Sequence, residues 1–124
     1  MRPAVTVVMM DIVKSRNLQG RFRRLVGTKA DREYTEKVYR PYHRRVVELL
    51  AAHGGNLHDD VGDQIAAYFD HAQDAMQFAV GLQRLMSSSP ITVPEGCDCP
   101  HLQLHVAIGT GSMEHAKGDT PPYR

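Results

Sequence analysis

The sequence has little cysteine, no tryptophan and no long hydrophobic run. Its only cysteines, Cys97 and Cys99, cannot form a disulfide framework, which favours a reducing, cytoplasmic location. The longest apolar run, residues 5–10, is far shorter than the roughly 18 residues of a membrane-spanning helix, so we expect no membrane contact by this segment. Fifteen basic and fourteen acidic residues leave a net charge of +1, which argues against broad binding to nucleic acid.

What is present suits one folded domain. The chain has 124 residues, of which 42% are hydrophobic and 23% charged, as in ordinary globular proteins. A chain of this size buries about two-thirds of the surface that its unfolded form exposes, so it needs no disulfide or metal ion to fold.

The hydrophobic pattern predicts strands and helices in the order β-α-α-β-β-α-β. Strands are expected at 5–10, 56–58, 64–69 and 101–109, and helices within 14–29, from about 31 to 53, and from about 70 to 86. Pro41 should kink or split the long helix. This order predicts an α+β fold, a ferredoxin-like or palm-type sandwich whose mostly antiparallel sheet carries its helices on one face.

Two aspartates occupy positions where such a fold could bring them together. Asp11 directly follows the first strand, and Asp63 lies in the turn between the second and third strands. Paired carboxylates can hold two Mg²⁺ or Mn²⁺ ions, a centre suited to phosphoryl and nucleotidyl transfer. Aspartate is also common at strand ends and in turns, so on these residues alone the two remain equally well explained as ordinary turn residues.

Four motifs resemble those of class III adenylate and guanylate cyclases. An apolar strand running into Asp11-Ile12 is similar to the first metal motif of that family, and the stretch from His53-Gly54-Gly55 to Asp70 is similar to the second. The alanine-rich segment 74–83 and the strand end at 106–111 match later motifs in the same order. The resemblance runs from about residue 5 to 111.

The resemblance implies an enzyme that converts ATP or GTP into a 3′,5′-cyclic nucleotide and pyrophosphate, for signalling. Two Mg²⁺ or Mn²⁺ ions would be held by Asp11, Asp63 and the carbonyl of Ile12. The triphosphate would face backbone N–H groups at the start of the next helix, contributed by Val13, Lys14, Ser15 and Arg16. The family also implies a homodimer or heterodimer, since its members build each site from two subunits.

The chain departs from the family pattern at two places. Asp59 stands where the family has its adenine-selecting lysine, so the base-side position carries a carboxylate and adenylate specificity is in question. The family's later Asn and Arg motif has no match before Arg124, so we expect residues 1–124 to be a single, C-terminally truncated cyclase domain with no catalytic residue beyond the metal ligands. The alternative is a catalytically inactive module that binds nucleotide or regulates a partner.

Two further interpretations carry less support. The segment Cys97-Asp98-Cys99-Pro100-His101 has soft ligands for zinc, but a zinc site normally takes four ligands at wider spacing, and a plain loop explains it better. A related palm-type domain that makes a dinucleotide would carry a Gly-Gly-Asp/Glu-Glu-Phe turn, which this sequence does not contain.

Overall fold

The computed structural model describes residues 4–94 and 101–112. Four strands and the helical segments between them follow one another in the predicted order. The strands are β1 (Ala4–Ile12), β2 (Asn56–Val61), β3 (Gln64–Phe69) and β4 (Leu104–Ser112). The α-helices are α1 (Ser15–Val26), α2 (Ala30–Tyr34), α3 (Arg40–Ala52) and α4 (Ala72–Ser88). A 3₁₀ turn, η1 (Gly27–Lys29), and a π turn, η2 (Thr35–Tyr39), join the first three helices.

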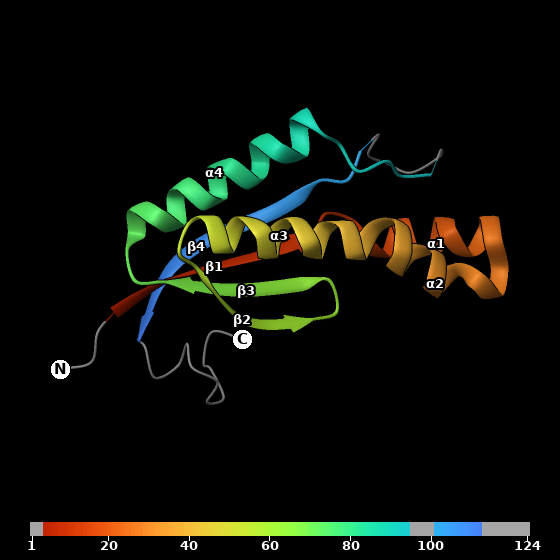
Figure 1. Ribbon diagram of the computed structural model, residues 1–124. Coiled ribbons are helices and arrows are strands. Elements are labelled where there is room, and N and C mark those ends of the chain that lie inside the picture. Colours follow the sequence, from red (N-terminus) through yellow and green to blue (C-terminus); the bar gives the residue numbers. More distant parts are fainter. Residues whose placement is uncertain (1–3, 95–100, 113–124) are drawn as a thin grey trace.

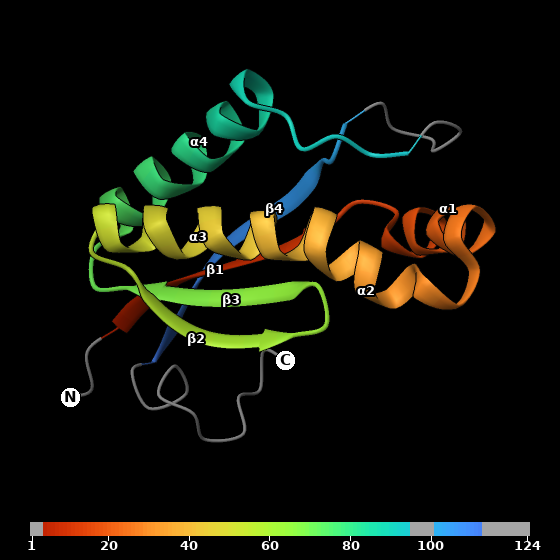
Figure 2. The same cartoon turned by 45° about the vertical axis from the view of Figure 1, so that its right-hand side comes forward.

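The strands form one antiparallel sheet in the order β2-β3-β1-β4. Helices α3 and α4 cross the same face of this sheet, while α1 and α2 lie beyond one end of it (Figure 1; Figure 2 shows the same layers from another side). The predicted α+β class, the element order and the placement of helices on one face are confirmed.

The core lies between the sheet and its helices. Alternate residues of β1 face the helices, so Val8, Met10 and Ile12 are buried in one cluster with Tyr42 and Phe78. The intervening residues Val5, Val7 and Met9 point to the opposite face, which no described helix covers. Because side chains alternate along a strand, Asp11 belongs to this uncovered face.

Pro41 changes the helix pitch without ending the helix. Residues 30–52 are helical throughout, but the turn before Pro41 is the π turn η2, in which the Arg40 amide donates to the Thr35 carbonyl. Proline has no N–H and its ring collides with the carbonyl four residues earlier, which explains a widened turn at this point. Pro41 was expected to kink or split the helix. The structure has instead a π turn within one continuous helical segment, residues 30–52, which we call the helical rod.

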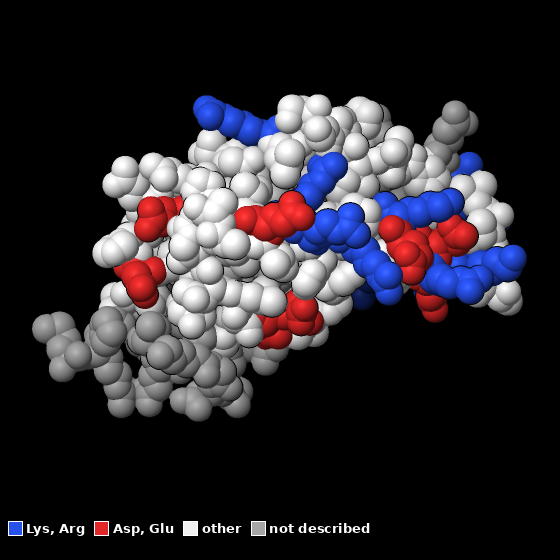
Figure 3. Space-filling view, in the orientation of Figure 1, with Lys and Arg blue, Asp and Glu red and all other residues white. Residues whose placement is uncertain are grey.

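Charged side chains are unevenly spread. Lys and Arg gather toward the end of the molecule that α1 and α2 form, with acidic side chains among them (Figure 3). Two such pairs are Lys37 with Glu33, at 2.9 Å, and Arg40 with Glu36, at 3.3 Å. Across residues 4–94 and 101–112, no helix is both long and apolar enough to cross a bilayer.

Candidate metal and nucleotide site

Asp11 is the next-to-last residue of β1, on the sheet face away from the helices. It pairs with His105 of β4, whose Nδ1 lies 3.3 Å from Asp11 Oδ1. That contact does not have hydrogen-bond geometry, and Oδ1 is buried with no hydrogen-bond partner. A buried, unpaired carboxylate oxygen is costly, and a bound cation is one way to satisfy it.

Asp63 occupies the two-residue turn between β2 and β3. Gly62 before it has a φ of 61°, a conformation that glycine adopts without steric cost, as at the first central position of a type II′ hairpin turn. Asp63 is half-buried. The tight turn therefore holds the second carboxylate at a defined place beyond the last β1–β3 register pair, Met10 with Ile65.

Tyr42 of α3 connects these two regions. Its hydroxyl is within hydrogen-bond distance of the Met10 carbonyl, at 3.2 Å, and of the Asp63 carbonyl, at 3.1 Å. Burial raises the pKa of the Tyr42 hydroxyl, and the carboxylates of Asp63 and Asp11 raise that pKa further. Both aspartates thus lie within electrostatic reach of one phenol. In the sequence Tyr42 shares the helical spacing of its apolar neighbours, and a single hydroxyl leaves no periodic signal that would reveal its contacts.

The segment after Asp11 is built from an unusual backbone conformation. Lys14, the residue before α1, has φ 55° and ψ 42°, the left-handed region. The Val13 amide donates to the Gln103 carbonyl at 2.9 Å and is therefore not available to a phosphate. This corrects the expectation for Val13. Of the four predicted triphosphate-binding positions, Lys14, Ser15 and Arg16 remain at the start of the helix.

A β-bulge decides where Asp59 points. The β2–β3 register pairs Leu57 with Ala67 but Asp59 with Ala66, so His58 is an extra residue. Ala66 also pairs with Met9, on the uncovered face of the sheet. The bulge thus turns Asp59 to the same face as Asp11, whereas a regular ladder would have aimed it at the helices.

The donors present fit a hard divalent cation. Mg²⁺ and Mn²⁺ prefer carboxylate and carbonyl oxygens, and Asp11 offers a buried oxygen that has no hydrogen-bond partner. The part of the chain that the structure describes holds no group of three or more His, Cys, Asp or Glu side chains suited to a metal. Further ligands would have to be carbonyl oxygens such as that of Ile12, water, or the phosphates themselves.

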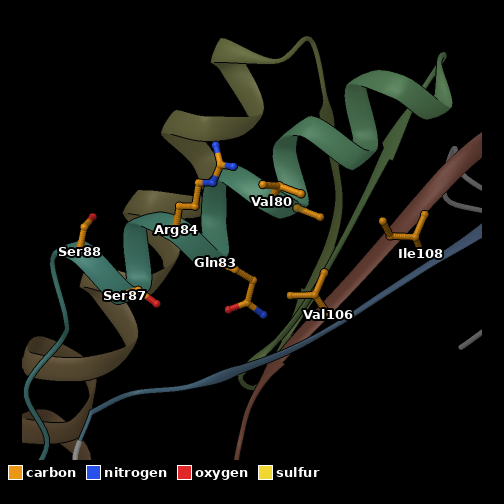
Figure 4. Close-up of a pocket in the computed structure, with 8 residues that line it drawn as sticks. Val80, Gln83, Arg84, Ser87, Ser88, Val106 and Ile108 are labelled. Carbon is orange, nitrogen blue, oxygen red and sulfur yellow. The ribbon is translucent and has the colours of Figure 1, made fainter.

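A groove elsewhere on the protein is unsuited to binding a cation. It lies between α4 and β4 and is lined mainly by apolar and hydroxyl side chains, with Arg84 as its charged member (Figure 4). Its apolar wall is formed by Val80, Val106 and Ile108. A groove of this composition offers no anionic ligand. The proposed zinc-binding segment at Cys97 to His101 falls mostly on residues 95–100, outside the described residues.

Comparison with known proteins supports the fold. No family model matches the sequence, and no curated protein matches it. Solved structures do match. The guanylyl cyclase domain of the RhoGC fusion protein from Blastocladiella emersonii superposes with a TM-score of 0.69 at 18% identity, covering 90% of this chain and 59% of that one.

Two further structures give the same picture. The guanylate cyclase domain of RhGC from Catenaria anguillulae, in complex with GTP, has a TM-score of 0.65 at 15% identity, covering 90% of this chain and 58% of its own. The adenylyl cyclase CyaB from P. aeruginosa has a TM-score of 0.63 at 20% identity, with the same two coverages of 90% and 58%. The chain therefore spans less than two-thirds of these domains. Its resemblance to the cyclases is confirmed at the level of structure: residues 4–94 and 101–112 adopt the fold of an adenylyl or guanylyl cyclase catalytic domain.

Proposed function

We propose that this chain is the metal- and triphosphate-binding part of a nucleotidyl cyclase domain that acts in cyclic-nucleotide signalling. The observation that carries the proposal is the buried oxygen of Asp11, which has no hydrogen-bond partner, next to a tyrosine hydroxyl that contacts the carbonyls of both Met10 and Asp63. In the proposed reaction, the 3′ oxygen of a nucleoside triphosphate bonds to its own α-phosphorus. The bond from that phosphorus to the β-phosphate oxygen breaks, pyrophosphate departs, and the hydroxyl proton passes to water.

In this proposal Asp11, Asp63 and the Ile12 carbonyl hold two Mg²⁺ or Mn²⁺ ions. Such ions, when bound, lower the pKa of an attacking hydroxyl and neutralise charge on the triphosphate and the departing pyrophosphate. The protein's own contribution is to hold one carboxylate near the end of β1 and the other in the turn between β2 and β3.

The triphosphate would lie at the start of α1. Lys14 is the N-cap residue of α1, and the amides of Ser15 and Arg16 belong to the first turn, where helix N–H groups have no acceptor within the helix and the helix dipole favours an anion. The Lys14 and Arg16 side chains are both exposed and would add positive charge. Arg21, Arg23 and Arg24 are better explained as the solvated face of the same helix.

Asp59 would read the base, and its chemistry favours guanine. Guanine presents two adjacent donors, N1–H and the 2-amino group, to which a carboxylate can accept paired hydrogen bonds. Adenine presents an acceptor at N1, which a carboxylate repels. Charge-assisted hydrogen bonds contribute about 1.5–3 kcal/mol each, so we expect GTP to be preferred over ATP by roughly ten- to hundredfold.

We place the domain in the cytoplasm, as a homodimer or heterodimer. The low cysteine content supports a reducing compartment. One structural neighbour is described as a non-canonical dimer and another as a monomer, so the subunit arrangement is open to experiment. Each subunit would contribute part of a shared site.

Metal binding and turnover should be tested separately. The first measurement is Mn²⁺ binding to the 124-residue chain, alone and with a non-hydrolysable GTP analogue. Asp11→Asn and Asp63→Asn should each abolish binding, while Asp70→Asn, at an exposed position outside the site, should leave it unchanged. The second measurement is formation of cyclic GMP and cyclic AMP by the full-length protein with Mn²⁺ and each triphosphate.

The two measurements separate the two candidate functions. Binding together with cyclic product supports the enzyme. Binding without product from any nucleotide, in a folded protein, supports the inactive nucleotide-binding module. Failure of the wild-type chain to bind Mn²⁺ would contradict the enzyme and leave only a module that regulates a partner without metal.

A further inference from the structure

Tyr42 lies on the helix side of the sheet, fully buried under the point where the two aspartate-bearing segments meet. Its single hydroxyl proton is shared between two carbonyl acceptors, on Met10 and Asp63. The first acceptor belongs to the residue before Asp11. The second belongs to Asp63 itself, so the one hydroxyl contacts the backbone of both metal-binding segments.

The sheet does not by itself fix the two carboxylates relative to each other. The last register pair between β1 and β3 is Met10 with Ile65, and both Asp11 and Asp63 lie beyond it. Asp11 is held instead by its pairing with His105 on the opposite side, in β4. The Tyr42 hydroxyl links the end of β1, through the Met10 carbonyl, to the β2–β3 turn, through the Asp63 carbonyl.

The π turn brings Tyr42 to this position. The buried residues of the helical rod are spaced by four: Tyr34, Val38, Tyr42, Val46 and Leu50. In a regular α-helix, a spacing of four drifts by roughly 40° at each repeat, so five such residues could not share one narrow face. A π turn has more residues per turn and drifts the opposite way, which keeps the stripe aimed at the sheet.

This hydroxyl is a neutral donor, because the phenol of a tyrosine ordinarily keeps its proton up to about pH 10. A neutral donor between two carbonyls stabilises their separation and adds no charge to a site that would hold cations. Its ring contacts the ring of Tyr39, at 6.1 Å between centroids, which fixes its orientation further.

We propose that Tyr42 is a positioning residue that sets the separation of the Asp11 and Asp63 carboxylates for a pair of divalent cations. This inference rests on the proposed function, because it assumes that the two aspartates bind metal. Tyr42 would touch neither the metal nor the nucleotide, and would act only through the backbone of the two ligand-bearing segments.

The test compares Tyr42→Phe with Tyr34→Phe in the 124-residue chain. Both variants keep the ring and lose one hydroxyl from the same buried stripe. The Tyr34 hydroxyl is the matched control, since it is buried in the same stripe beside Gln19 and donates to neither aspartate-bearing segment. The readouts are Mn²⁺ affinity, from loss of the electron paramagnetic resonance signal of free Mn²⁺, and the free energy of unfolding without metal.

We expect Tyr42→Phe to bind Mn²⁺ roughly tenfold more weakly, the lower end of the loss seen when residues that orient metal ligands are removed. Tyr34→Phe should bind as the wild type does. If a variant is less stable than the wild type, its Mn²⁺ affinity can be obtained from the increase in unfolding free energy on adding Mn²⁺. That increase depends on the metal affinity of the folded state and not on how stable the variant is without metal.

Three results would overturn the inference. Equal Mn²⁺ affinity of Tyr42→Phe and wild type would remove the positioning role and leave the proposed metal site intact. Equal weakening by both tyrosine variants would indicate a general effect of core polarity. Absence of Mn²⁺ binding by the wild type would remove the proposed function, and the inference with it.

Discussion

At the scale of single residues, Lys14 has the most unusual backbone. It is the non-glycine residue with a positive φ among those described, at 55°. The left-handed conformation costs an L-residue about 1–2 kcal/mol, and such strain tends to be kept where a ligand is bound. Here it occurs between Asp11 and α1, where the chain must turn sharply from strand to helix.

This strain can be measured with two substitutions at the same position. Lys14→Val and Lys14→Gly both lose the ammonium group and its interactions, so the difference between them reports on the backbone. We expect Lys14→Val to be less stable than Lys14→Gly by about 1–2 kcal/mol, since glycine adopts positive φ freely and a β-branched residue does not. Urea unfolding gives the comparison, and equal stabilities would show that this turn is not strained.

Buried tyrosines should make the protein sensitive to alkali. Burial raises the pKa of Tyr34 to about 12, and it raises the pKa values of Tyr42 and Tyr39 as well. The Gln19 side chain lowers the pKa of Tyr34, but burial outweighs this effect. Above about pH 10 the unfolded chain loses phenolic protons that the folded chain retains. The tyrosines therefore contribute their full share to the unfolding free energy below about pH 10, and this contribution is lost as the pH rises above about 10.

The expected slope can be assigned to individual residues. Each such tyrosine lowers the unfolding free energy by up to roughly 1.4 kcal/mol per pH unit between its unfolded and folded pKa values. Urea unfolding between about pH 8 and 11 should show a plateau followed by a decline above about pH 10. Tyr34→Phe should make the decline shallower without lowering stability at neutral pH. An unchanged slope in that variant would contradict the assignment.

At the scale of elements, the junction from α3 to β2 depends on two glycines with different roles. Gly54 has a φ of 72°, and the Gly55 amide donates to the Leu50 carbonyl at 2.8 Å, which ends the helix. A Cβ on Gly55 would lie 2.5 Å from ring carbons of Phe69 and 2.7 Å from Leu50 Cδ2. Gly55 thus allows the helix end to pack directly against β3.

Gly55→Ala should therefore destabilise the protein by about 1–3 kcal/mol, the usual cost of overpacking a core. Gly81→Ala is the matched control. It lies inside α4, where a Cβ would be no nearer than 3.7 Å to its closest neighbour, His53 Nε2. Alanine is favoured over glycine in a helix by about 1 kcal/mol, so this variant should be more stable than wild type. Thermal unfolding of both variants measures the two changes in stability. If both variants were stabilised, or both destabilised, the packing argument would be contradicted.

At the scale of the whole molecule, metal binding and folding should be linked. A ligand that binds only the folded state raises the unfolding free energy by about 2.7 kcal/mol at one hundred times its dissociation constant. We expect Mn²⁺ to stabilise the wild type in this way and to have no such effect on Asp63→Asn. Equal stabilisation of both would place the binding site elsewhere. Chemical denaturation at several Mn²⁺ concentrations measures this linkage.

Much of the fold was predictable, for identifiable reasons. The alternating residues of 101–109 predicted the last strand, which the structure places at Leu104–Ser112. The apolar run 5–10 predicted β1, and Gly62 marks the hairpin turn. Helix ends were less well predicted: α4 begins at Ala72, not Asp70, and no side chain caps it. The π turn before Pro41 could not be predicted, because the same proline is compatible with a kink, a break or a wider turn.

The candidate site divides in the same way. Local patterns of apolar and turn residues depend only on near neighbours, so they predicted Asp11 at the end of the first strand and Asp63 in a turn. Three features could be found only in the folded molecule: the His58 bulge turns Asp59 to the face of Asp11, the Val13 amide donates to Gln103, and Tyr42 joins Met10 to Asp63. Each of these depends on contacts between segments far apart in the chain, and a contact of that kind is set by packing and register, which leave no local pattern in the sequence.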